Sequence, residues 1–275
     1  MMQNQIPVKH VRAPWPSVFQ AFVVLSILYV CSVWLIFTLA PIVKSWSLPE
    51  GLSWPLSYLT TYGVATLVFV TAAAWRGRFR ESLFAWRIPQ ASVSAQITLI
   101  ALINLVASAG IVTLFLHQTY IQSDPVTNLN IFHVVTSIVI APAIEETLFR
   151  GIMLHAFLKQ LKPQYAVVVS SILFTLFHEH PARMFVAFPM GLLLGWLYFQ
   201  YRSIVPTILL HACINVAAIA LSFLRLRLYP HLPEPGSGEF VLLTLAALAA
   251  LGATVVWTMH LHKTLTISRS AAPLP

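Results

Sequence analysis

Residues 131–157 read IFHVVTSIVIAPAIEETLFRGIMLHAF, and this stretch decides the class of fold. A run of about 20 predominantly apolar residues is long enough for a helix to cross the hydrocarbon core of a bilayer. Three charged residues, Glu145, Glu146 and Arg150, nevertheless lie in the middle of the run. A charged side chain near the bilayer centre costs at least about 2.5–3.5 kcal/mol, so such residues mark a functional site by default.

The composition of the whole chain agrees with a membrane protein. Of its 275 residues, 58% are hydrophobic and 9% are Asp, Glu, Lys or Arg. A soluble domain has about 25% charged residues, and a disordered chain has low hydrophobicity, so both classes are excluded. A porin-like barrel would alternate apolar and polar residues, whereas the apolar residues here form long unbroken runs. We therefore expect an all-α polytopic integral membrane protein.

The apolar runs predict about eight transmembrane helices. They cover residues 18–40, 55–75, 92–117, 131–157, 164–180, 184–200, 204–224 and 240–260. Segments on one side of these spans hold 11 Lys and Arg residues, and those on the other side hold 4. Basic residues are enriched in cytoplasmic segments, so we expect both termini to be cytoplasmic.

The net charge of +8 does not indicate a nucleic-acid partner. The basic residues are scattered along the chain, whereas a nucleic-acid-binding protein concentrates them on one patch. The two cysteines, Cys31 and Cys213, lie inside apolar runs. We interpret them as small hydrophobic residues within the membrane and not as a disulfide or a metal-binding pair.

The first cluster of polar residues is the Glu-Glu pair with its arginine. Glu146 and Arg150 are four residues apart, so they share one face of a helix and can form an ion pair. A purely structural ion pair would need one Glu and one Arg. Glu145 lies about 100° round the helix and remains for another partner, which favours a functional site.

Two further clusters lie on other predicted spans. His178 follows Phe174 by one helical turn, and Asn215 follows His211 in the same way. Each pair alone could be a structural contact between helices. The depth of each residue in the membrane follows from the helical rise of about 1.5 Å per residue, counted from the nearest cytoplasmic charge. This depth is roughly 20–24 Å for Glu145, His178 and Asn215, and roughly 14 Å for His211. All four thus fall in one slab of the membrane, which predicts a single site.

The three clusters together resemble the CPBP family. This family comprises the CAAX prenyl endopeptidases and the bacterial Abi-type proteins, which are intramembrane proteases. The resemblance rests on Glu145-Glu146-x-x-x-Arg150, Phe174-x-x-x-His178 and His211-x-x-x-Asn215. It implies a protease core over residues 130–225, after three N-terminal spans in 1–129 and before a last helix and cytoplasmic tail in 226–275. It also implies a location in the inner membrane of a bacterium. Glu179 and His180 are not part of the family pattern.

The resemblance implies a role for each motif residue. Glu145 and His178 would activate a water molecule, and His211 and Asn215 would stabilise the oxyanion of the attacked peptide bond. Glu146 and Arg150 complete the first motif, and Phe174 completes the second. The residues themselves agree with this chemistry, because amide hydrolysis needs a general base and donors aimed at the developing oxyanion. Cys213 lies within the third motif, but we interpret it as a small hydrophobic residue, so the motifs supply no Ser or Cys nucleophile.

The same residues are compatible with three other functions. The two glutamates, His178 and His211 could instead bind zinc, as in an intramembrane metalloprotease, since three protein ligands and a water form a catalytic zinc site. A non-enzymatic proton-coupled transporter would also use intramembrane Glu, His and Arg, although transporters more often show internal repeats. An immunity protein with an inactive site is a further alternative. We favour glutamate-activated water without a cofactor, acting on a membrane-associated protein or peptide in the lipid bilayer.

Overall fold

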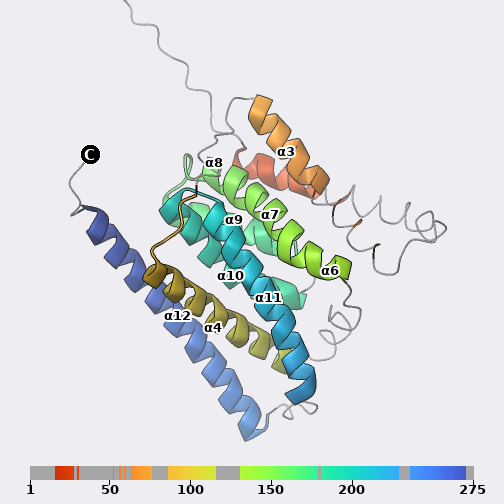
Figure 1. Ribbon diagram of the computed structural model, residues 1–275, viewed down its shortest axis with the longest axis vertical. Helices are drawn as coiled ribbons and strands as arrows, with labels where there is room; N and C mark the ends of the chain where they lie inside the picture. Colours follow the sequence, from red (N-terminus) through yellow and green to blue (C-terminus); the bar gives the residue numbers. More distant parts are fainter. Residues whose placement is uncertain are drawn as a thin grey trace, which may run out of the picture.

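The computed structural model describes residues 16–27, 30, 52, 56, 59, 63–75, 86–115, 131–178, 181–228 and 236–270 (Figure 1). Every element in these ranges is helical, which confirms the predicted all-α class. Within the described residues, four helices are long and apolar enough to cross a membrane: Ala91–Val112, Ile131–Phe157, Arg183–Tyr201 and Gly238–Lys263. Shorter apolar helices cover Val18–Ile27, Pro163–Leu176 and Val205–Leu221. Much of the first two predicted spans and Cys31 lie outside the described residues, so the total of eight spans and their orientation stay predictions.

The stretch 131–157 forms one continuous helical rod that contains two π-helical segments. Its parts are α6 (Ile131–Val135), η4 (Thr136–Ile140), α7 (Ala141–Glu146), η5 (Thr147–Leu154) and α8 (His155–Phe157). The segments η4 and η5 are π-helical. Wider turns of this kind occur frequently at functional sites. Here they flank the short segment that carries both glutamates.

Prolines and one left-handed residue set the limits of the following helices. Pro163 and Pro181 are the first residues of α9 (Pro163–Leu176) and α10 (Pro181–Tyr201). Proline suits this position because the first N–H of a helix has no intrahelical partner. Arg202 then adopts a positive φ of 52° and ends α10. The Ser203 hydroxyl accepts a hydrogen bond from the Val205 N–H at 3.2 Å, where α11 (Val205–Leu228) begins.

The helix α10 occupies a central place in the packing. It contacts α9, α11, η5 and α4 (Ala91–Phe115), while α11 also contacts η4 and α7. At one edge of the bundle, α12 (Gly238–Ser270) runs side by side with α4 (Figure 1). The helix α3 (Val64–Trp75) packs against η5. The segment with the two glutamates therefore packs against α11, and η5, which follows it in the rod, packs against α9 and α10. Cys213 is a free, exposed thiol on α11.

Candidate active site

Glu146 and Arg150 form the buried centre of the site. The Arg150 Nη1 donates to Glu146 Oε1 at 2.9 Å, and neither side chain has any exposed surface. This is the ion pair that their i,i+4 spacing predicts. The second guanidinium nitrogen, Nη2, donates to the carbonyl oxygen of Gly191 at 3.1 Å. The guanidinium also lies over the Phe174 ring, 4.3 Å from its centroid. Arg150 thus ties the rod to both α9 and α10.

Gly191 brings the backbone of α10 close enough for this contact. A Cβ atom at this position would lie 3.1 Å from the Ser171 Cβ and 3.3 Å from the Phe174 Cδ1. Any side chain would therefore push α10 away from α9 and carry the Gly191 carbonyl away from Arg150. Sequence reasoning missed Gly191, because one glycine in an apolar run carries no motif. The only signal was that a glycine inside a helix often has a packing reason.

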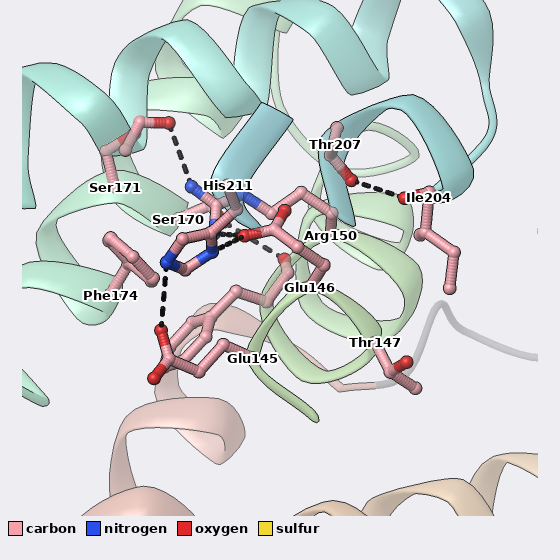
Figure 2. Close-up of polar contacts among 12 residues, drawn as sticks. Glu145, Glu146, Thr147, Arg150, Ser170, Ser171, Phe174, Ile204, Thr207 and His211 are labelled. Atoms are coloured by element: carbon pink, nitrogen blue, oxygen red, sulfur yellow. Dashed lines mark hydrogen bonds and ion pairs between the residues drawn. The ribbon is translucent and has the colours of Figure 1, made fainter. Parts of the chain in front are cut away.

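His211 lies between the two carboxylates (Figure 2). Its Nδ1 is 2.9 Å from Glu146 Oε1, and its Nε2 is 3.9 Å from Glu145 Oε2. The estimate from the sequence counted the backbone rise and placed His211 several ångströms below Glu145, within one slab of the membrane. The 3.9 Å contact joins the ends of the two side chains, so it brings the two residues together as the common slab predicts.

His178 lies at the end of α9, against Phe174. Its Nδ1 is 2.9 Å from the Phe174 carbonyl oxygen, and the two rings meet with centroids 4.7 Å apart. A carbonyl oxygen can only accept, so Nδ1 carries the hydrogen, and in the neutral ring Nε2 has a lone pair. Glu145, which is 8% exposed, interacts electrostatically with His178. Glu179 and His180 lie outside the described residues.

Phe174 forms a shared wall of the site. Besides Arg150 and His178, it contacts the His211 ring at a centroid distance of 5.9 Å and the Phe149 ring at 5.3 Å. All these contacts except that with Arg150 are edge-on, a preferred arrangement of aromatic rings. The conformation of Phe174 therefore influences Arg150 and both histidines together.

Asn215 lies one turn beyond His211 on α11, beside η4. Its Nδ2 donates to the carbonyl oxygen of Ser137 at 2.7 Å. In η4 the N–H of Ala141 bonds to the Thr136 carbonyl, five residues back. The next bond of this series would run from residue 142 to Ser137, but Pro142 has no N–H. The proline thus leaves the Ser137 carbonyl available, and Asn215 occupies it.

The donor set does not fit a zinc ion. Within the described ranges, no three His, Cys, Asp or Glu side chains are grouped so that they could hold a metal ion. Glu146 Oε1 also accepts from a guanidinium, and a cation there disfavours a second cation. The expectation of activity without a metal stays a prediction.

Two further histidines of the described residues stand apart from this arrangement. His155 Nδ1 is 2.9 Å from the Tyr198 hydroxyl, where the rod meets α10. His262 on α12 contacts Gln200 and Trp196 on α10. Neither contact includes a residue of the three motifs, so we interpret both histidines as structural.

Comparison with known families supports the assignment of the motifs. Residues 127–217 match the family described as type II CAAX prenyl endopeptidase Rce1-like. This range includes all three motifs, and the family consists of peptidases. Comparisons with curated proteins and with solved structures gave no significant match. The family match confirms the resemblance that the three motifs carry: residues 127–217 of this integral membrane protein are similar to the type II CAAX prenyl endopeptidases.

Proposed function

We propose that this protein is an intramembrane endopeptidase that hydrolyses a peptide bond with water activated by Glu145 and His178. The observation that carries the proposal is the unequal environment of two adjacent buried carboxylates. Glu146 Oε1 lies within 2.9 Å of both Arg150 and His211. Glu145 lies at the edge of the site, near His178 and the outer nitrogen of His211. One carboxylate is thereby fixed, and the other remains for proton transfer.

In this mechanism each motif has a separate role. Glu145 takes a proton from water, and the Nε2 lone pair of His178 accepts a hydrogen bond from the same water and orients it. His211 and Asn215 donate hydrogen bonds to the oxyanion that forms on the attacked carbonyl. Loss of one such donor typically costs about 2.7–4 kcal/mol in the transition state. Glu146 and Arg150 hold His211 in place and do not contact the substrate.

The substrate that this proposal favours is the C-terminal region of a prenylated, membrane-associated protein. The family match supplies this substrate class. A site on membrane-spanning helices is accessible to a chain whose end is held at the bilayer by a lipid anchor. We further propose that the protein lies in the inner membrane of a bacterium with both termini in the cytoplasm.

The test uses the purified protein in lipid nanodiscs with a fluorogenic CAAX peptide, farnesylated or not. Glu145→Gln and His178→Ala are each expected to lower kcat by about 10²–10⁴-fold, the usual effect of losing a general base. Asn215→Ala is expected to lower it by about 10²–10³-fold, as for a lost oxyanion donor. His155→Ala is the matched control, since it removes a half-buried histidine of the same rod outside the motifs. It should retain nearly normal activity.

The results separate catalysis from stability. Equal losses in all four variants, with lowered thermal stability, would mean that the motifs only maintain the fold. Normal activity of Glu145→Gln would refute the proposal directly. Equal cleavage of farnesylated and unmodified peptides would retain the peptidase and reject the substrate class.

A further inference from the structure

We infer that Arg183 determines specificity by binding the C-terminal carboxylate of the substrate with its guanidinium. This inference rests on the proposed function and deepens it, because it names a second group of the substrate that the site recognises. A guanidinium can bind both oxygens of a carboxylate through two parallel N–H···O hydrogen bonds. The packing of α10, the charges around the site and the length of the substrate segment support this role.

The register between α9 and α10 follows from two glycines. The two helices lie side by side (Figure 1). A Cβ atom at Gly195 would lie 3.1 Å from the Val167 Cγ1, and a Cβ atom at Gly191 would lie 3.1 Å from the Ser171 Cβ. Four residues back along α10 thus correspond to four residues forward along α9, so the helices run in opposite directions.

This register places Arg183 at the end of the site. Arg183, Ala187 and Gly191 follow one another at intervals of four residues and therefore share one face of α10. Ala187 belongs to the same buried apolar cluster as Phe177, the residue that ends α9. One turn beyond Ala187, Arg183 reaches the level just past His178. The electrostatic interaction between Arg183 and His178 agrees with this position.

Arg183 presents a positive charge at the margin of the site. Its side chain is exposed, so an incoming substrate can reach it. Arg150 already pairs with Glu146 and has no exposed surface. Lys162 and Arg202 lie at the opposite ends of α9 and α10. Of these four cations, Arg183 is therefore the one placed to bind a charged group of the substrate.

The proposed substrate carries an anion at a matching distance from the bond that is cleaved. A CAAX motif forms the last four residues of a protein, and its terminal carboxyl group is ionised at neutral pH. A bond hydrolysed within the motif is at most three residues from that carboxylate, which is about 10 Å in an extended chain. Arg183 precedes Gly191, which contacts Arg150, by eight residues, or about 12 Å along α10. The terminal carboxylate of a bound substrate therefore falls within reach of the Arg183 side chain.

Two peptides that differ only at the C-terminus test the role of Arg183. One is the fluorogenic CAAX peptide with a free carboxylate, and the other is the same peptide with a terminal carboxamide. The unmodified protein in nanodiscs should cleave the free acid with a kcat/KM about 10-fold higher, a small effect for a charge-assisted hydrogen bond because Arg183 is exposed. The difference should lie in KM, since a group distant from the reacting atoms binds ground state and transition state alike.

Variants assign this preference to one side chain. Arg183→Met should raise the KM for the free acid about 10-fold and thereby equalise the two peptides. Arg183→Lys keeps the charge but not the paired N–H donors, so it should retain part of the preference. Lys162→Met is the matched control, because it removes an exposed cation at the opposite end of α9 whose side chain makes no capping hydrogen bond. It should keep the full preference.

A binding measurement gives a second readout that needs no turnover. Fluorescence anisotropy with the Glu145→Gln variant should show the free acid bound about 10-fold more tightly than the carboxamide. Added salt should weaken binding of the free acid only, because it screens an exposed ion pair. The further change Arg183→Met should make the two dissociation constants equal.

Each outcome decides one question. A preference for the free acid that survives Arg183→Met would overturn the inference, and so would equal binding of the two peptides. Equal losses for both peptides in Arg183→Met would also overturn it, since they would assign Arg183 to folding or to contact with lipid headgroups. Normal cleavage by Glu145→Gln would instead refute the proposed function, while the comparison of acid and carboxamide would still decide the role of Arg183.

Discussion

Replacement of Arg150 by methionine is expected to destabilise the protein strongly, although Arg150 is not a catalytic group. Methionine keeps much of the length of the side chain and can still pack over Phe174. It removes the donor to Glu146 Oε1 at 2.9 Å and the donor to the Gly191 carbonyl at 3.1 Å. Both members of the ion pair are fully buried, so no water can replace the lost guanidinium.

The size of the effect follows from the charge that remains. Removing one partner of a buried ion pair costs about 3–5 kcal/mol, because the other charge stays buried and uncompensated. This corresponds to roughly a 150-fold to 5,000-fold change in the unfolding equilibrium constant. The double variant Arg150→Met with Glu146→Gln removes both charges, and it should recover most of the loss. The remaining deficit should reflect the hydrogen bonds to Gly191 and His211.

The free energy of unfolding is measured by titrating the protein in mixed micelles with a denaturing detergent and following the loss of helical circular dichroism. Arg87→Met is the matched control, since Arg87 is exposed in the segment before α4, and it should be indistinguishable from the unmodified protein. A single variant within about 1 kcal/mol of the unmodified protein would refute the reasoning, since surface pairs already account for that much. A double variant as unstable as the single variant would also refute it.

Three further predictions concern other parts of the site. Gly191→Ala should lower the free energy of unfolding by about 1–3 kcal/mol, as overpacking does, and it should also lower kcat. Gly252→Ala should change neither quantity, because its Cβ would meet nothing within 4 Å. Equal melting temperatures of the two variants would contradict this prediction. Pro142→Ala supplies an N–H that competes with Asn215 for the Ser137 carbonyl. The kcat should therefore fall by up to about 10²-fold with no loss of thermal stability. An unchanged kcat would show that the contact with Ser137 does not position Asn215. Extensive chelation should leave the activity intact and elemental analysis should find no stoichiometric zinc, whereas a loss restored by zinc alone would make the metalloprotease interpretation primary.

The sequence predicts the parts of this molecule that depend on local pattern. The apolar run 131–157 has the predicted limits, and the four-residue spacing of Glu146 and Arg150 gives the predicted ion pair. The distance between His211 and the carboxylates could not be predicted, because it depends on the winding of η5 and on how the rod packs against α11. The role of Gly191 also depends on the approach of two helices, and no local pattern encodes that distance.

The contacts of Glu146 and Arg150 also make the rod depend on helices that follow it in the chain. The Gly191 carbonyl follows Arg150 by 41 residues, and His211 follows Glu146 by 65. A helix with three charged residues inserts poorly into lipid on its own. The docking of α10 and α11 supplies these charged residues with further partners, so a chain truncated before α11 should assemble poorly in the membrane.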